Sequence, residues 1–246
     1  MPKGVFITGT DTGVGKTTVS AALILALKKR GIKVGAMKPI ETGCPRRDGD
    51  LLPLDGMLLR EAAGMDDPLE LVTPVRFEQP LAPLVASALE GRPVDLAALR
   101  SAYEVLSGKY GFMVVEGAGG LLVPVSRTVE RGTESMGVPS VYFMCDLIKE
   151  MRLPVVVVAR PALGTLNHTL LTVEHALRAG LRIAGIVINH TSPSRDDPAE
   201  RTNPSVLSEI CQLPFVEVMP YAGASAGAVQ CGILPDTVVD LLIRFQ

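Results

Sequence analysis

Residues 9–17 read Gly-Thr-Asp-Thr-Gly-Val-Gly-Lys-Thr and carry the clearest chemical signature in the sequence. Glycines allow successive backbone N–H groups to curl around an anion, and the start of a following helix adds partial positive charge. The Lys16 ammonium can reach the β- and γ-phosphates of a nucleotide, and the Thr17 hydroxyl can bind Mg²⁺. The stretch therefore predicts a phosphate-binding loop for ATP and Mg²⁺, although it does not specify a reaction.

One position departs from the common loop pattern. Thr10 stands where the outer glycine is expected, and Gly9 lies one residue further out. A glycine-rich turn without a ligand is the alternative interpretation. The nucleotide site is favoured, because an apolar strand, the Lys16-Thr17 pair and a helical pattern coincide at this spacing.

Lys38 ends the second apolar segment, and Pro39 stiffens the turn that follows it. Ligands of open α/β sheets bind beyond the carboxyl ends of the strands, so Lys38 is expected near the phosphates. A lysine there can neutralise charge that develops during phosphoryl transfer. Spacing alone leaves this role and that of a surface lysine at a strand end equally open.

Glu116 ends the apolar run 112–116 and is the first candidate for a carboxylate that contacts Mg²⁺, directly or through water. The glycines in 117–120 permit close approach of the backbone to a ligand. A surface carboxylate is the alternative reading of Glu116. A second acidic ligand could come from a cluster after the second strand, where spacing does not choose among Asp48, Asp50 and Asp55.

These residues need a sheet to bring them together, and short apolar runs do alternate with helical patterns along the chain. Strands are predicted at 5–9, 34–39, 112–116, 155–159, 183–189 and 215–219. Helices are predicted at 15–30, 54–63, 96–106, 165–179 and 204–211. This alternation predicts an α/β fold of P-loop NTPase type, with a mostly parallel sheet, helices on both faces and a single domain spanning 1–246. The polar segments 127–140 and 195–203 are expected to be an inserted loop and a mobile surface loop.

Composition narrows the class of protein. Hydrophobic residues make up 47% and aromatic residues 4% of 246 residues, which predicts an aliphatic core, as in parallel sheets buried on both faces. The net charge of -2, without a basic cluster, argues against nucleic-acid binding. No apolar stretch reaches the length of a membrane span, and the first strand leaves no room for a signal peptide, so a cytoplasmic protein is expected. Free thiols rather than disulfides or zinc ligands are expected at Cys44, Cys145, Cys211 and Cys231.

Three motifs together resemble the dethiobiotin synthetase family, the ATP-dependent carboxylases of biotin biosynthesis. They are the segment 6–17, Lys-Pro-Ile-Glu-Thr-Gly at 38–43, and Val-Glu-Gly-Ala-Gly-Gly at 115–120. Weaker similarities at 77–83, 90–93 and 163–168 extend the resemblance over about residues 5–220. A wide superfamily shares the phosphate-binding loop, but its combination with the other two motifs is much narrower. The family's own loop has the longer spacing from Gly9.

The resemblance implies a role for each matching residue. The ATP phosphates would be held by Gly13, Val14, Gly15, Lys16, Thr17 and Thr18. The remaining nucleotide contacts would come from Gly117, Ala118, Gly119, Asn189, Pro220, Tyr221 and Ala222. Mg²⁺ would be bound by Thr17, Asp55 and Glu116. Lys38 matches the catalytic lysine, and Thr42 matches a contact of the diamine substrate. Across a homodimer interface, the substrate carboxylate would be accepted by a helix start formed from Gly164, Thr165, Leu166 and Asn167.

The implied reaction converts 7,8-diaminononanoate, CO₂ and ATP into dethiobiotin, ADP and phosphate. One amine captures CO₂ as a carbamate, the γ-phosphoryl group is transferred to that carbamate, and the neighbouring amine closes the ureido ring. Such a reaction needs no protein nucleophile. The protein supplies positioning and charge stabilisation.

Some positions depart from the family pattern, and other functions remain as alternatives. Leu84 stands where the family motif often has histidine. His190 stands where aspartate occurs in some relatives, which leaves the preference for adenine open. A cobyrinate-type amidase is expected to carry a glutaminase domain that this length does not accommodate. A partition-type switch ATPase would carry a second loop lysine where Asp11 stands. A nucleotide-binding module without catalysis is also an alternative. Only the family resemblance of the motif that contains Lys38 argues against it.

Overall fold

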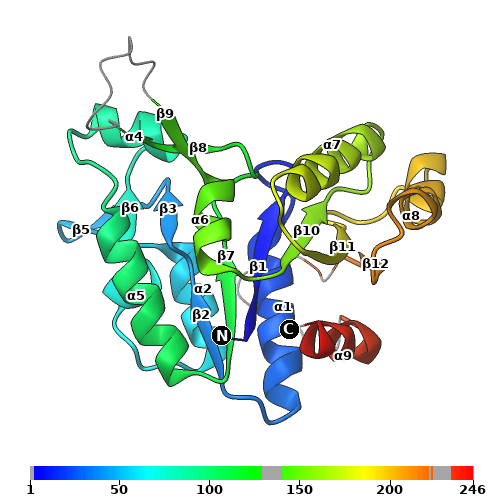
Figure 1. The fold of residues 1–246 in the computed structure, drawn as a ribbon, viewed down its shortest axis with the longest axis horizontal. Helices are drawn as coiled ribbons and strands as arrows, with labels where there is room; N and C mark the ends of the chain where they lie inside the picture. Colours follow the sequence, from blue (N-terminus) through cyan, green and yellow to red (C-terminus); the bar gives the residue numbers. More distant parts are fainter. Residues whose placement is uncertain (1–2, 129–139, 222, 224–233, 246) are drawn as a thin grey trace.

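A central parallel sheet organises the molecule. The structure is a computed structural model that describes residues 3–128, 140–221, 223 and 234–245. Within them, six parallel strands lie in the order β12-β11-β10-β1-β7-β2 (Figure 1). Their bounds are β1 Gly4–Gly9, β2 Val34–Met37, β7 Phe112–Glu116, β10 Val155–Ala159, β11 Ile183–Asn189 and β12 Val216–Met219. The predicted α/β class with a mostly parallel sheet is confirmed.

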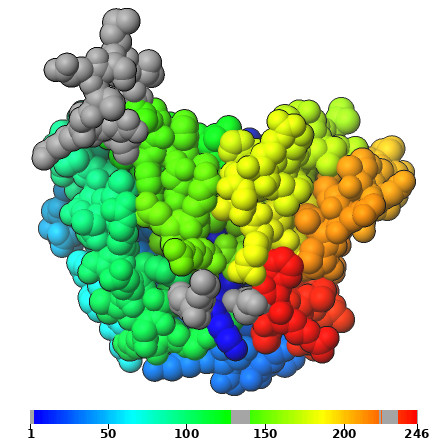
Figure 2. All heavy atoms as spheres, viewed as in Figure 1, coloured from blue at the N-terminus to red at the C-terminus, as the bar shows by residue number. Residues whose placement is uncertain are grey.

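Helices cover both faces of this sheet, as its aliphatic strands require. One face carries α1 Lys16–Lys29, α2 Leu54–Ala63 and, packed on α1, α9 Asp236–Arg244. The other carries α5 Leu96–Lys109, α6 Met144–Met151, α7 Thr165–Arg178 and α8 Pro198–Cys211. In Figure 1, α6 lies in front of β7, and α1 runs behind β1. Figure 2 shows the same view filled in, with α5 and α6 on one side and α7 and α8 on the other.

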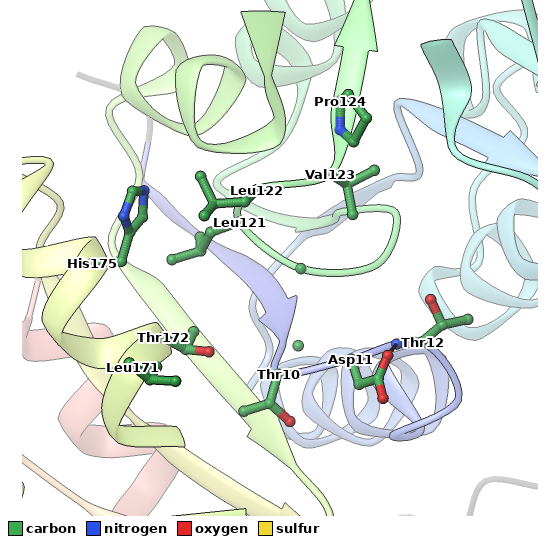
Figure 3. A pocket seen from close by; sticks show the side chains of 12 residues that line it. Thr10, Asp11, Thr12, Leu121, Leu122, Val123, Pro124, Leu171, Thr172 and His175 are labelled. Carbon is green, nitrogen blue, oxygen red and sulfur yellow. Dashed lines mark hydrogen bonds between the residues drawn. The ribbon is translucent and has the colours of Figure 1, made fainter. Parts of the chain in front are cut away.

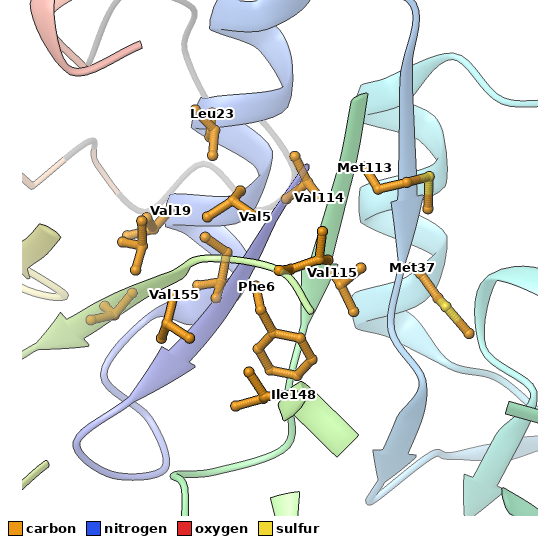
Figure 4. Close-up of a cluster of buried hydrophobic side chains, with 14 of the residues drawn as sticks. Val5, Phe6, Val19, Leu23, Met37, Met113, Val114, Val115, Ile148 and Val155 are labelled. Atoms are coloured by element: carbon orange, nitrogen blue, oxygen red, sulfur yellow. The ribbon is translucent and has the colours of Figure 1, made fainter. Parts of the chain in front are cut away.

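The core shows why β1 is buried on both sides. Val5 and Phe6 are adjacent in β1 and are both fully buried, so they project to opposite faces of the sheet. Val5 lies beside Val19 of α1, while the Phe6 ring lies beside Ile148 of α6 (Figure 4). The central strand, which leads into the phosphate-binding loop, is thus fixed from both faces.

Several short elements were not predicted, because none of them has the uninterrupted aliphatic run or the long helical period that identified the other elements. β3 Ile40–Thr42 pairs in parallel with β6 Val75–Phe77. Two antiparallel pairs are β4 Arg46–Arg47 with β5 Asp50–Leu51, and β8 Pro124–Thr128 with β9 Ser140–Phe143. The short helices are α3 Leu69–Val72 and α4 Pro83–Leu89.

The mobile loop predicted at 195–203 is wrong for most of its length, because α8 begins at Pro198. The Asp197 side chain caps this helix by accepting the Glu200 N–H at 2.9 Å. Glu200 in turn accepts the N–H groups of Arg195 and Asp196. Aspartate, proline and glutamate at these spacings form a helix-start signal that the sequence reading missed.

The predicted loop 127–140 is also corrected at its ends, which belong to β8 and β9; residues 129–139 lie outside the described residues. The helices α6 and α9 were missed. The second strand ends at Met37, so Lys38 lies just beyond it. In the part of the chain described here, no helix combines the length and apolarity needed to cross a membrane.

Two glycine substitutions test the packing of the sheet. A methyl group at Gly185 in β11 would meet the Phe215 ring at 2.6 Å, whereas Gly108 near the end of α5 faces open space. We expect Gly185→Ala to lower the free energy of unfolding by about 1–3 kcal/mol through overpacking. Gly108→Ala should raise it by about 0.5–1 kcal/mol. Urea unfolding measures both, and equal effects of the two substitutions would contradict this packing.

Candidate functional site

The loop at 9–17 connects β1 to α1, and the side chain of its Lys16 contacts the loop's own backbone. Gly13 and Gly15 adopt the left-handed backbone region, at φ 75° and 84°, which only glycine adopts without strain. Gly15 is also the N-cap of α1 and has no side chain, so the first N–H groups of the helix remain available to an anion. Lys16 is buried and donates to the Asp11 carbonyl at 3.1 Å.

A chain of polar contacts joins this loop to the ends of two neighbouring strands. The Thr17 hydroxyl donates to Glu116 Oε1 at 2.9 Å. The Lys38 ammonium donates to the same Glu116 oxygen and, at 2.8 Å, to Asp55 Oδ2. The structure therefore brings together Thr17, Lys38, Asp55 and Glu116, which come from four separate segments.

The charged groups of this cluster shift one another's pKa values. Burial alone would lower the pKa of Lys38, but the carboxylates of Glu116 and Asp55 raise that pKa above its ordinary value. Burial would raise the pKa of Asp55, yet the ion pair with Lys38 holds it below its ordinary value. Burial, followed by the positive charge of Lys38, lowers the pKa of Lys16. Because its pKa is raised, the Lys38 side chain is protonated at neutral pH.

The oxygen atoms of this cluster fit a small divalent cation. Glu116 is fully buried, and its Oε2 atom has no hydrogen-bond partner among the described residues. Mg²⁺ prefers oxygen ligands and usually takes one or two carboxylates together with substrate phosphates and water. Within the described residues, no group of three or more His, Cys, Asp or Glu side chains could hold a metal. Two carboxylates and a hydroxyl suit a metal that phosphates help to bind.

A cavity of about 580 Å³ opens over this cluster. Its lining includes Lys16, Lys38, Asp55 and Glu116, together with the segment 80–83. Gly13, Gly15, Thr17, Thr42, Ala118 and Gly119 also line it. The volume suits a small-molecule ligand. Val14, Thr18, Gly117, Asn189, Pro220 and Tyr221 lie outside this lining.

The glycine run after β7 packs closely on the phosphate-binding loop. A methyl group at Gly117 would meet the Phe6 ring at 2.7 Å, and one at Gly120 would meet the Gly9 carbonyl oxygen at 2.9 Å. Gly119 has a φ of 62°. A side chain at Gly120 would therefore push the backbone away from the loop.

Asn189 ends β11 and contacts the far side of the phosphate-binding loop. Its Nδ2 atom donates to the Val14 carbonyl at 3.0 Å, while its buried Oδ1 atom has no partner among the described residues. Pro220 and Tyr221 follow β12, the strand that neighbours β11. Ala222 lies outside the described residues.

The start of α7 lies apart from the main cavity. Gly164 is its N-cap with a φ of 91°, Thr165 is buried, and Asn167 is exposed; Leu166 is partly buried. Leu163, just before the helix, is 91% exposed.

A second cavity, of about 370 Å³, separates α7 from the phosphate-binding loop. Leu121 and Leu122 lie on one side and Leu171, Thr172 and His175 of α7 on another, with residues 10–12 below them (Figure 3). Leu122 and Leu171 are 55% and 58% exposed. This apolar, open cavity has none of the charged cluster described above.

Two contacts of the site were missed in the sequence. Glu41 belongs to the motif 38–43 but received no role, although its buried carboxylate accepts two backbone N–H groups at the start of α2. Burial raises the pKa of Glu41 to about 7. Arg160 pairs with Asp11 of the phosphate-binding loop. The signal for Arg160 was its place directly after β10, at the same edge of the sheet.

A family model and several known proteins are similar to most of this chain, and the three relatives described below share one name. A family model described as an AAA domain matches residues 3–225. The ATP-dependent dethiobiotin synthetase BioD of Thermodesulfovibrio yellowstonii is 51% identical over 221 residues, which cover 90% of each chain. The proteins of that name from Anaeromyxobacter sp. (strain K) and Bacillus subtilis (strain 168) are 43% and 40% identical. Those matches cover 89% of this chain and 90% and 87% of the relatives.

Solved structures show the same fold at much lower identity. The cell division ATPase MinD of Pyrococcus furiosus matches with a TM-score of 0.53 and 20% identity over 100% of both chains. A ParA family ATPase from Chlorobium tepidum matches with a TM-score of 0.50 and 15% identity, over 97% of this chain and 92% of that chain. These similarities support the P-loop NTPase fold of this chain and do not indicate its function.

Proposed function

This chain belongs to the ATP-dependent dethiobiotin synthetase family, and from that premise we propose that its charged cavity carries out the family's reaction. The chain is an ATP-dependent cyclo-ligase. Its substrates are 7,8-diaminononanoate, CO₂ and ATP, and it works in the cytoplasm, where ATP is supplied. One observation carries the proposal: a buried lysine, Lys38, lies between two carboxylates at the base of a cavity that the phosphate-binding loop also lines.

The reaction proceeds in three balanced steps. An amine of the substrate adds to CO₂ and loses a proton, which gives a carbamate. A carbamate oxygen then attacks the γ-phosphorus of ATP, and the bond to ADP breaks. The second amine attacks the carbonyl carbon of this mixed anhydride, loses a proton and expels phosphate. Because both amines belong to one molecule, ring closure gains from proximity.

The residues of the cavity have roles in this reaction that follow from their positions. Lys16 and the N–H groups of residues 13–18 hold the ATP phosphates. Lys38 lies where the carbamate approaches the γ-phosphate and offsets the repulsion between the two anions. Thr42 also lines this cavity and is proposed to contact the diamine. Nucleotide contacts by residues 117–119 are supported by the close approach of Gly119 and Gly120 to Thr12 and Gly9 of the loop.

Mg²⁺ completes the charge balance of the site. Thr17, Asp55 and Glu116 would hold it, and when bound it would neutralise phosphate charge during phosphoryl transfer. Lys38 contacts both carboxylates in this structure. Binding of a divalent cation to the same oxygens would free its ammonium to turn toward the reacting groups.

Asn189 is proposed to recognise adenine. Its unpartnered Oδ1 atom can accept a hydrogen bond from the exocyclic amine, while the bond from Nδ2 to Val14 fixes the orientation of the amide. Pro220, Tyr221 and Ala222 are proposed to border the base. His190, which follows Asn189, stands where aspartate occurs in some relatives.

A symmetric dimer is proposed to complete the substrate site. Gly164, Thr165, Leu166 and Asn167 would present the N-terminus of α7 to the substrate carboxylate in the partner's cavity. The exposed leucines Leu122 and Leu171, which both line the second cavity, support an interface there, because exposed apolar surface marks contact sites.

Leu171→Glu tests this assembly. We expect the substitution to convert the dimer into a monomer, because it places charge within an apolar interface. The KM for the diamine should then rise roughly tenfold, since a helix N-terminus contributes up to about 2 kcal/mol to binding an anion. Leu177→Glu is the control: Leu177 is 54% exposed on the same helix but does not line the second cavity. Sedimentation velocity distinguishes the two, and a monomeric but unimpaired Leu171→Glu would contradict the proposal.

The proposed chemistry is tested by following an oxygen atom. With freshly added ¹⁸O-labelled bicarbonate, the phosphate released should carry one labelled oxygen, because the carbamate oxygen attacks phosphorus. Mass spectrometry of phosphate, quenched within the first turnovers, measures this. Unlabelled phosphate accompanied by labelled dethiobiotin would exclude the mixed anhydride.

A further inference from the structure

Glu41 in β3 is a buried carboxylate whose contacts are unusually specific. It is 6% exposed. Its Oε1 atom accepts the Asp55 N–H at 3.0 Å, and its Oε2 atom accepts the Gly56 N–H at 2.9 Å. Both donors lie in the first turn of α2, where N–H groups have no acceptor within the helix. Glu41 therefore caps α2 from a different element.

The start of α2 depends on this external cap. Its N-cap residue is Pro53, which offers no side-chain acceptor. Gly56 also lies so close to Thr73 that a methyl group on Gly56 would meet Thr73 Oγ1 at 1.9 Å. The hydrogen bonds to Glu41 and the close contact with Thr73 together fix the position of this turn.

The turn so fixed carries Asp55, whose carboxylate reaches Lys38. Glu41 thus binds the backbone of the residue that the proposed function assigns to Mg²⁺. Groups that orient a metal ligand commonly change metal affinity 10- to 100-fold when they are mutated. Glu41 also lies three residues after Lys38, so one short segment supplies both the cation and the support for its carboxylate partner.

We propose that Glu41 is a positioning residue for metal binding, which holds the first turn of α2 so that the Asp55 carboxylate faces the ion and Lys38. Glu41 also lines the cavity, but in this role it acts through the backbone of the turn and not on the ion itself. The inference rests on the proposed function, because it requires Asp55 to be a metal ligand.

Glu41→Gln tests the inference with Mn²⁺ as the probe and ADP as the nucleotide. Glutamine keeps the shape but presents one oxygen and one NH₂ group to two N–H donors, so one contact becomes repulsive. We expect the dissociation constant of Mn²⁺, measured by the paramagnetic resonance of free Mn²⁺, to rise roughly 10- to 100-fold. ADP affinity without metal should be unchanged. Turnover should recover at high Mg²⁺, which a general loss of structure would not allow.

Glu90→Gln is a matched control. Glu90 also accepts two consecutive backbone N–H groups, those of Glu78 and Gln79, but it lies away from α2, so this variant should keep the parent's Mn²⁺ affinity. Should Glu41→Gln fail to fold, Glu41→Asp takes its place, because it keeps the charge and draws the oxygens back from the turn.

Asp55→Asn separates the inference from its premise. If Asp55→Asn weakens Mn²⁺ binding while the Glu41 variant binds as the parent does, the positioning role is wrong and the metal assignment stands. If Asp55→Asn leaves Mn²⁺ binding unchanged, Asp55 is not a ligand and the inference fails with it. Equal weakening in the Glu41 and Glu90 variants would also overturn the specific role of Glu41.

Discussion

Replacing Lys38 with glutamine is expected to lower turnover by roughly a hundredfold or more, the scale of removing one preorganised group that stabilises transition-state charge. The substitution removes the ammonium between Asp55 and Glu116 and keeps much of the side-chain volume. ATP affinity should change much less, because Lys16 remains on the phosphates. ADP release measures turnover, and calorimetry measures affinity.

The same substitution has a consequence for stability. Without Lys38, the buried carboxylate of Glu116 has lost its cation, and an unpaired buried charge is strongly destabilising. We expect Mg²⁺ to raise the melting temperature of Lys38→Gln more than that of the parent, because the metal replaces the missing charge. Near-parental turnover would make Lys38 a strand-end lysine without a catalytic role. A parallel collapse of ATP binding would make it chiefly a nucleotide ligand.

Lys16→Gln is expected to act on binding first. Lys16 is buried in the phosphate-binding loop, and losing one partner of a buried charge pair costs about 2–5 kcal/mol. We therefore expect ATP affinity to fall roughly a hundredfold or more, and turnover to fall with it. Isothermal titration with ATP and Mg²⁺ gives the affinity directly.

Lys28→Gln is the control for this loss. Lys28 belongs to the same helix, but it is exposed and donates to the Ala62 carbonyl, far along α1 from the loop. Its substitution should leave ATP affinity at the parental value. An intact affinity in Lys16→Gln, or an equal loss in Lys28→Gln, would show that the loop does not bind the phosphates as proposed.

The fold was predictable where the sequence has strong local periodicity. The strands at 112–116, 155–159 and 183–189 were placed at their observed bounds, because fully buried parallel strands read as uninterrupted aliphatic runs. The order of strands did not follow from local pattern: β7 enters between β1 and β2 only through long-range packing. β3 and β6 are three residues each, and pairing across 35 positions of sequence creates them.

The site was predictable where the spacing of a local motif specifies which residues come together. Spacing placed Lys16 and Thr17, but it could not choose Asp55 from its neighbours Asp48 and Asp50. That choice depends on α2 turning Asp55 toward Lys38, whereas Asp48 and Asp50 are exposed around the β4–β5 turn. Glu41 went unassigned for the same reason, since its partners are backbone groups of a distant turn and leave no sequence signature.

The most direct test of the central account measures ADP release with and without each co-substrate. With ATP and Mg²⁺, the account predicts rapid ADP release only when 7,8-diaminononanoate and bicarbonate are both present. One dethiobiotin should form per ADP, and Lys38→Gln should abolish most of this coupled release. ADP release at the same rate without the diamine or without bicarbonate, or release without formation of the ureido ring, would contradict the account.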